Sequence, residues 1–172
     1  MKIISIASAA AFLACILTAN YVTTEHGMVP VGFGLIATAG TYLAGLTFVL
    51  RDTVQDGLGK GVTIGLIAAG ALLSYLVADP FIALASGVAF LFAEAADLAI
   101  YTPLRRRGYI RAAVASNVVG AVIDTFLFLW IAGFPIPGAW QGQMVGKLTI
   151  TLAVVLVVAG VRGAVSRESV RV

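Results

Sequence analysis

Six apolar runs, each long enough to cross a lipid bilayer as a helix, constrain the fold of this chain more than any other feature of its sequence. A helix needs about 20 predominantly apolar residues to cross the hydrocarbon core of a bilayer, which is about 30 Å thick. The connections between the runs are short and rich in turn-forming residues, so none of them separates two domains. We therefore predict a single all-α integral membrane domain over residues 1–172, with six transmembrane helices. The predicted helices cover residues 3–22, 29–50, 61–78, 81–102, 110–133 and 143–165.

The low content of charged residues supports a bilayer as the solvent of this chain. Charged residues make up 11% of the sequence and the mean hydropathy is +1.04, whereas a soluble domain carries about 25% charged residues. The formal net charge is +3, but no basic patch is interleaved with stacking aromatic residues, so we expect no nucleic-acid partner. The single cysteine, Cys15, excludes an internal disulfide, and we expect a small apolar helix residue there rather than an acylation site.

Basic residues mark alternate connections between the predicted helices. Positive residues are typical of the cytoplasmic side of a membrane protein. The remaining connections carry Glu25, His26 and Asp79 but no lysine or arginine, and only Lys147 departs from the pattern. We therefore predict a multi-pass protein of the cell inner membrane with both termini in the cytoplasm. The basic residues on the predicted cytoplasmic side are Lys2, Arg51, Lys60, Arg105, Arg106, Arg107, Arg111, Arg162, Arg167 and Arg171.

Several polar side chains interrupt the apolar runs. An ionisable residue at membrane depth costs several kcal/mol unless it is partnered or solvated, and those that persist usually line a cavity. Glu94 and Asp97 share one face of the fourth predicted helix, and Asn117 and Asp124 share one face of the fifth. We predict that these faces meet around a central substrate pocket. The predicted substrate-binding residues are Asn20, Glu94, Asp97, Asn117, Asp124, Gln143 and Lys147.

Two structural alternatives stay open for the acidic residues. Glu94 and Asp97 can pair with the arginines that follow the fourth predicted helix, and Asp124 can form a purely structural pair with Lys147. If Lys147 neutralises one carboxylate, the remaining acceptors are available to a ligand. Carboxylate and amide groups suit the adjacent N–H donors of a planar ring, and aromatic walls stack on a heterocycle. The pattern therefore favours a small planar nitrogen compound as the transported solute.

The sequence carries no pattern for metal binding or for catalysis. There is no cluster of histidine and cysteine with the spacing of metal ligands. The one histidine lies in a connection, so no serine, histidine and aspartate triad is expected. We predict that the chain is not an enzyme and that it uses no cofactor and no metal ion.

Four strings carry a family resemblance. They are ASNVVGAVIDTFLFLWIAGF, then GQMVGKL, and upstream of both LRDTVQDGLGKG and AEAADLAIYTPLRRRG. Together they resemble the VUT family, which comprises vitamin-uptake and queuosine-precursor transporters. The resemblance extends from Ala19 to Lys147 and implies an inner-membrane protein of six helices, similar to the substrate-binding subunits of energy-coupling-factor transporters. It also implies import of 7-cyano-7-deazaguanine or its 7-aminomethyl relative.

The same resemblance bears on the site residues. The connection after the second predicted helix reads Gln55-Asp56-Gly57, where the family has an acidic residue before an aromatic-glycine pair, so no role is assigned to Asp56. The residues that match the family pattern directly are Asn117, Asp124, Gln143 and Lys147, and those that match less tightly are Glu94 and Asp97.

Three other functions remain open at this point. The chain can be the substrate-binding subunit of a multi-component vitamin transporter, which needs an energising partner because the sequence holds no ATP-binding motif. It can be a membrane enzyme acting on a nucleobase or a lipid, or a purely structural helical bundle. The expected partners are the lipid bilayer and a deazapurine-like solute, with a homo-oligomer or an energising partner as further alternatives.

Overall fold

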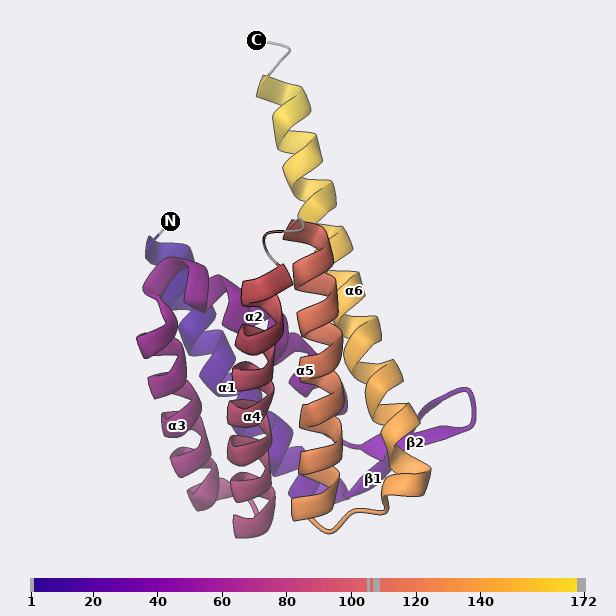
Figure 1. Cartoon of the computed structure of the whole chain (residues 1–172). Helices are drawn as coiled ribbons and strands as arrows, with labels where there is room; N and C mark the ends of the chain where they lie inside the picture. The colour runs from indigo at the N-terminus through magenta and orange to yellow at the C-terminus, as the bar shows by residue number, and fades with distance from the viewer. Residues whose placement is uncertain (1, 105, 107–108, 170–172) are drawn as a thin grey trace.

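Six helices and one β-hairpin make up the part of the chain that the computed structural model describes, which is residues 2–104, 106 and 109–169 (Figure 1). The prediction of an all-α protein with six transmembrane helices is confirmed in part: six helices are present, and the hairpin is an addition to the all-α class. The helices are α1 (Lys2–His26), α2 (Thr41–Leu58), α3 (Lys60–Val77), α4 (Pro80–Leu104), α5 (Tyr109–Ile131) and α6 (Ile136–Ser169). The hairpin consists of β1 (Met28–Gly32) and β2 (Leu35–Thr38).

The hairpin corrects the prediction of one continuous helix over residues 29–50. The two strands are antiparallel, with Val29 opposite Ala37 and Pro30 opposite Ile36. Pro30 has no N–H to donate within a helix, and the turn places Phe33 in the left-handed region at φ 54° between two glycines of positive φ. Apolar composition indicates burial but does not distinguish a strand from a helix. Helix α2 therefore begins only at Thr41.

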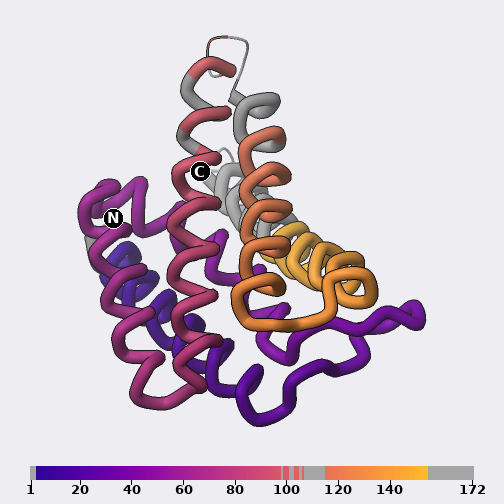
Figure 2. Tube along the Cα trace, turned by 60° about the horizontal axis from the view of Figure 1, so that its bottom comes forward, coloured from indigo at the N-terminus to yellow at the C-terminus, as the bar shows by residue number. Residues whose placement is uncertain are grey.

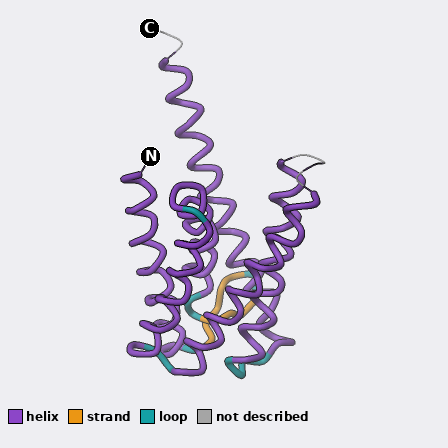
Figure 3. Tube along the Cα trace, turned by 60° about the vertical axis from the view of Figure 1, so that its left-hand side comes forward, coloured by secondary structure: helices purple, strands orange, loops and turns teal. Residues whose placement is uncertain are grey.

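The hairpin lies within the length of the helices and not beyond their ends (Figures 1 and 3). It projects sideways next to α6, as Figure 2 shows. Strand β2 packs closely on α6 because Gly142 leaves room for the backbone of Ile36: a Cβ at position 142 would lie 2.7 Å from the carbonyl carbon of Ile36 and closer still to its oxygen. Non-helical backbone at membrane depth is tolerated where protein covers it, and α6 provides this cover.

Three helical segments are long and apolar enough to cross a membrane within the described residues. They are Ile3–His26, Lys60–Val77 and Pro80–Asp97, and Ala115–Ile131 is a shorter apolar helix. Helix α3 exposes large apolar side chains such as Leu72 at 73% and Leu76 at 80%. Such a surface is unfavourable in water and is expected where lipid tails surround the protein.

The helices form two groups that meet along one interface. Helix α4 packs mainly against α5, whereas α1 and α6 both pack against α2, and α3 contacts α1 and α4. We call the interface between the α4–α5 pair and the group of α1, α2 and α6 the seam. The start of α1 and the end of α6 lie at the same end of the bundle, which we call the termini end (Figure 1). The opposite end, near the hairpin, is the hairpin end.

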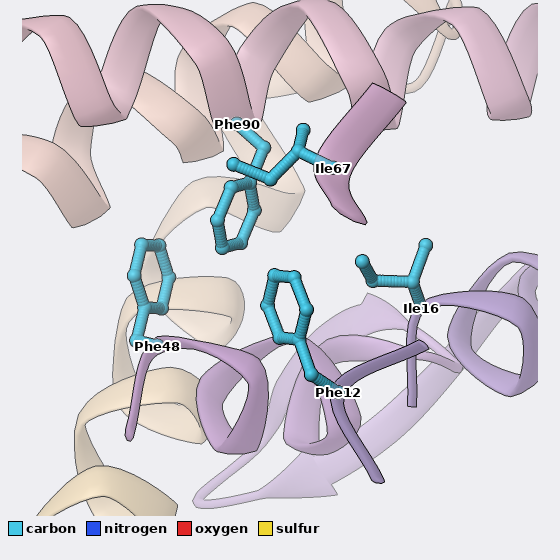
Figure 4. Close-up of a cluster of buried hydrophobic side chains, with 5 residues drawn as sticks. All are labelled: Phe12, Ile16, Phe48, Ile67 and Phe90. Carbon is cyan, nitrogen blue, oxygen red and sulfur yellow. The ribbon is translucent and has the colours of Figure 1, made fainter. Parts of the chain in front are cut away.

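A cluster of aromatic and aliphatic side chains fills the centre of the bundle. Phe90 of α4 stacks on Phe48 of α2 with ring centroids 5.2 Å apart and meets Phe12 of α1 edge-on at 5.8 Å. Ile16 and Ile67 complete the cluster, and Figure 4 shows the three rings turned toward one another. Since Phe90 and Phe48 come from opposite sides of the seam, this cluster joins the two helix groups.

Candidate functional site

A small cavity with a mixed apolar and polar lining lies on the seam, on the hairpin side of the aromatic cluster. Its volume is about 40 Å³, and every helix except α3 contributes to its wall, together with the end of β2. The floor of the cavity includes Phe90. Its walls carry two charged side chains of opposite sign, an amide and three threonine hydroxyls. The lining residues are Ala19, Thr23, Thr38, Gly40, Thr41, Ala44, Ser86, Phe90, Asp124, Phe128, Gln143 and Lys147.

The charged wall of the cavity is an ion pair between α5 and α6. Lys147 Nζ lies 2.7 Å from Asp124 Oδ2 and donates a second hydrogen bond to Thr125 Oγ1 at 2.9 Å. Lys147 is 2% exposed and Asp124 is 6% exposed, so water screens this pair very little. No hydrogen bond from the described residues reaches Asp124 Oδ1. This pairing leaves the site with no net charge and keeps one carboxylate oxygen available.

The polar wall opposite this pair is a chain of hydrogen bonds that starts at Gln143. Gln143 Nε2 donates to Thr38 Oγ1 at 3.0 Å, and the hydroxyls of Thr38 and Thr41 are 3.2 Å apart. Gln143 is 1% exposed, and its Oε1 has no hydrogen-bond partner among the residues that the structure describes. An unsatisfied buried acceptor costs about 1–3 kcal/mol. The Gln143 carbonyl is therefore ready to accept a hydrogen bond from a ligand in the cavity.

A second polar group lies nearer the termini end and is centred on Arg51 of α2. Arg51 Nη1 is 2.8 Å from Glu94 Oε2, and Arg51 Nη2 is 2.6 Å from Asp52 Oδ1 and 3.5 Å from Asn117 Oδ1. The contact to Glu94 is an ion pair without hydrogen-bond geometry, because Glu94 Oε2 has no hydrogen-bond partner in the described part of the chain. Arg51 is only 3% exposed. We call Arg51, Asp52, Glu94 and Asn117 the Arg51 cluster.

The seven predicted site residues therefore occupy different places. Only Asp124, Gln143 and Lys147 line the cavity. Glu94 and Asn117 belong to the Arg51 cluster, so the arginine that pairs with Glu94 comes from α2 and not from the segment after α4.

The other two predicted residues lie outside both polar groups. Asp97 is buried about one turn beyond Glu94, close enough to interact electrostatically with Arg51. Asn20 donates to Ser74 Oγ at 2.8 Å and thereby joins α1 to α3.

Sequence reasoning missed Arg51 and the threonines of the site. Arg51 directly follows an apolar run and was expected at the solvated cytoplasmic boundary, but it lies inside the bundle. Thr38 and Thr125 carried no signal, because an isolated threonine is common on any helix or strand. The one signal for a buried Arg51 is that Glu94, at membrane depth, needs a cation as its partner.

Residues 77–162, which are half of the chain, match the model of the family described as putative vitamin uptake transporter. The chain belongs to this family. No curated protein and no solved structure matches it. The family segment contains Glu94, Asn117 and the three predicted residues that line the cavity, whereas Arg51 and the hairpin precede it. Family membership and the apolar helices together make this a membrane protein of a transporter family.

Proposed function

We propose that this protein imports a small planar nitrogen heterocycle through the cavity on the seam. The best-suited solute is a queuosine precursor, 7-cyano-7-deazaguanine or 7-aminomethyl-7-deazaguanine. In this proposal the membrane is the inner membrane, the termini end faces the cytoplasm, and the solute reaches the cavity from the hairpin end.

The observation that carries the proposal is the pair of unused acceptors in the cavity. Gln143 Oε1 has no partner among the described residues, and Asp124 Oδ1 remains available beside the ion pair. The ring N–H and the exocyclic amine of a deazaguanine present adjacent donors to such acceptors. Phe90 and Phe128 line the same cavity and offer apolar faces to a flat ring.

The ion pair also bears on the choice between the two precursors. Because Lys147 neutralises Asp124, the cavity offers no uncompensated negative charge to a cation. The 7-aminomethyl compound carries an ammonium group at neutral pH, whereas the 7-cyano compound is uncharged. Burying an unpaired ammonium is costly, so the arrangement favours the nitrile.

Solute binding requires the cavity to widen. A volume of about 40 Å³ holds about three water molecules, while sites for small molecules usually have roughly 300–1,000 Å³. The cavity lies on the seam between two helix groups, and separation of these groups is the movement that enlarges it. The structure thus corresponds to a contracted state of the proposed site.

Uptake of labelled 7-cyano-7-deazaguanine by cells that cannot synthesise it tests the proposal. We expect import by the wild type, at least about tenfold weaker import by Asp124→Ala and Gln143→Leu, and normal import by the exposed control Glu25→Gln. Normal import by both cavity variants, folded and at wild-type abundance, would contradict the site. Import of another nucleobase or vitamin instead would contradict the substrate alone.

Two further measurements separate the proposal from the other functions. Recovery of the labelled compound in chemically unchanged form speaks against a membrane enzyme, which would convert it. Uptake into lipid vesicles that contain only this chain shows that no energising partner is needed. Uptake that appears only when a transmembrane and ATPase complex is added identifies the chain as a substrate-binding subunit.

A further inference from the structure

The side chains on the seam follow the same order along two helices. Helices α2 and α4 both run from the hairpin end to the termini end (Figure 1). On α2, Ala44 lines the cavity, Phe48 belongs to the aromatic cluster and Arg51 comes next. On α4, Phe90 forms the floor of the cavity and Glu94 follows one turn later. With a rise of about 1.5 Å per residue, the Arg51 backbone lies about 10 Å beyond Ala44 along α2.

These side chains cross the seam and block the way from the cavity to the termini end. The stacked rings of Phe48 and Phe90 make the first barrier (Figure 4). Arg51 makes the second, since it contacts both Glu94 of α4 and Asn117 of α5, the two helices on the far side of the seam. Its guanidinium carbon also lies 5.6 Å from the centre of the Phe48 ring, so the two barriers are in contact.

At the hairpin end of the seam, Phe128 of the cavity wall stacks on Phe134 of the connection from α5 to α6, with ring centroids 6.2 Å apart. An open groove of about 540 Å³ lies there between the end of α1, the start of α4 and the connection from α5 to α6. Thr23 lines both this groove and the cavity, so the two spaces share a wall residue. Phe128, Phe134 and the buried Thr23 therefore stand between the cavity and this groove, whereas on the termini side an ion pair adds to the aromatic stack.

We propose that Arg51 is the residue that holds the termini end of the solute path closed and releases it during transport. This inference rests on the proposed function, because it assumes that a solute crosses the cavity. Opening moves the α4–α5 pair away from α2, separates Arg51 from Glu94 and Asn117, and unstacks Phe48 from Phe90. Asp52 stays bound to Arg51 throughout, since both residues are on α2 and two guanidinium nitrogens contact Asp52 Oδ1 at 2.6 and 3.0 Å. Arg51 thus retains one ionic partner in either state.

Access of a thiol reagent to the cavity tests this role without any solute. The parent is Cys15→Ala with Ser86→Cys, which places the one thiol on the cavity wall. A membrane-impermeant maleimide is applied to vesicles of both orientations, and a tag on the C-terminus identifies the termini side. We expect the parent to react faster from the hairpin side than from the termini side, because the ion pair of Arg51 stands only on the way to the termini end. Arg51→Gln and Glu94→Gln should each react from the termini side at least about tenfold faster than the parent. The reason is that loss of the ion pair turns an open state populated to about 0.1–10% into the major state.

Two matched variants separate the barrier from general loosening of the fold. Asp52→Asn removes the ion pair of Arg51 with Asp52, which is similar in length to the pair with Glu94 but lies within α2. This variant should react with the maleimide from the termini side as slowly as the parent. Arg51→Glu combined with Glu94→Arg restores an ion pair across the seam and should return the termini-side rate toward that of the parent.

The outcomes for the barrier and for the solute are distinct. If folded Arg51→Gln and Glu94→Gln react with the maleimide from the termini side no faster than the parent, the role of Arg51 is overturned. It is also overturned if Asp52→Asn and Glu94→Gln react equally fast from that side. If the protein does not import a deazaguanine, but the Arg51 and Glu94 variants are labelled faster from the termini side as expected, the proposed solute is overturned and the barrier stands.

Discussion

Replacing Gly142 with alanine tests whether the hairpin forms part of the cavity wall. An added Cβ would lie 2.7 Å from the carbonyl carbon of Ile36, whereas ordinary contacts of this kind are 3.4–4 Å. Strand β2 must therefore withdraw from α6 by at least about 0.7 Å to relieve the contact with the carbon, and by more than that to relieve the closer contact with the oxygen. If β2 moves as a unit away from α6, the distance from Gln143 Nε2 to Thr38 Oγ1 grows from 3.0 Å to about 3.7 Å or more, which is too long for a hydrogen bond.

The expected cost follows from these two effects. Overpacking of a close contact costs about 1–3 kcal/mol, and loss of the hydrogen bond to Gln143 costs about 0.5–1.5 kcal/mol. After a gain of about 1 kcal/mol from the helix propensity of alanine over glycine, we expect Gly142→Ala to lower the free energy of unfolding by about 0.5–3.5 kcal/mol in a detergent unfolding titration. The solute concentration for half-maximal uptake should rise about tenfold, because Gln143 loses the partner that orients it.

Gly138→Ala is the matched control for this prediction. Gly138 lies one turn earlier on α6, and a Cβ there would lie 3.9 Å from the nearest atom, the Cδ1 of Ile36. Both variants gain the same helix propensity of alanine over glycine, about 1 kcal/mol, so their difference isolates the contact with the strand. Equal stability and equal uptake of Gly142→Ala and Gly138→Ala would refute the packing of the hairpin on α6.

Substitutions at three other places in the structure have definite expected outcomes. Asp124→Asn and Lys147→Met should each lower the free energy of unfolding by about 3–5 kcal/mol, because each leaves a buried group without its ionic partner. The double variant should recover most of this loss. If the two losses instead add up in a denaturant titration, the ion pair between Asp124 and Lys147 is contradicted. Thr38→Val should weaken solute binding in a direct binding assay by up to about tenfold through loss of one hydrogen bond, and unchanged affinity would contradict its place in the site. Phe90→Ala should cost about 3–5 kcal/mol of unfolding free energy, whereas Phe92→Ala, exposed at 60%, should cost far less; equal losses would place the core elsewhere.

Apolar length in the sequence was enough to predict helices and a membrane environment, but not the hairpin. The run from Val29 to Leu50 has no charged residue, and both a helix and a buried strand satisfy such a pattern. Pro30 and the Gly-Phe-Gly sequence around Phe33 are the local signals of a turn, since glycine readily adopts the positive φ that all three residues of this sequence have. Length alone therefore outweighed turn chemistry in the prediction.

Polar residues within the apolar runs indicated which side chains lie inside the protein, but not how they divide into groups. Glu94 and Asp124 are both buried, yet they face different cations, Arg51 and Lys147. Helical periodicity assigns a side chain to a face of its own helix and leaves open its depth relative to other helices. The separation of the cavity from the Arg51 cluster depends on the tertiary packing of α2 across the seam, which one sequence does not contain.

The late start of α2 has an electrostatic consequence for the cavity. Because the hairpin occupies residues 28–38, the first turn of α2 begins at Thr41, on the cavity wall. The first N–H groups of a helix have no acceptor within the helix and form the positive end of its dipole. At α2 the N-cap is Gly40, which has no side chain to cap the N–H groups that follow, while its own N–H donates to Thr23 Oγ1. The backbone of α2 thus presents partial positive charge to the cavity, which suits the carbonyl oxygen or the nitrile nitrogen of an otherwise uncharged solute.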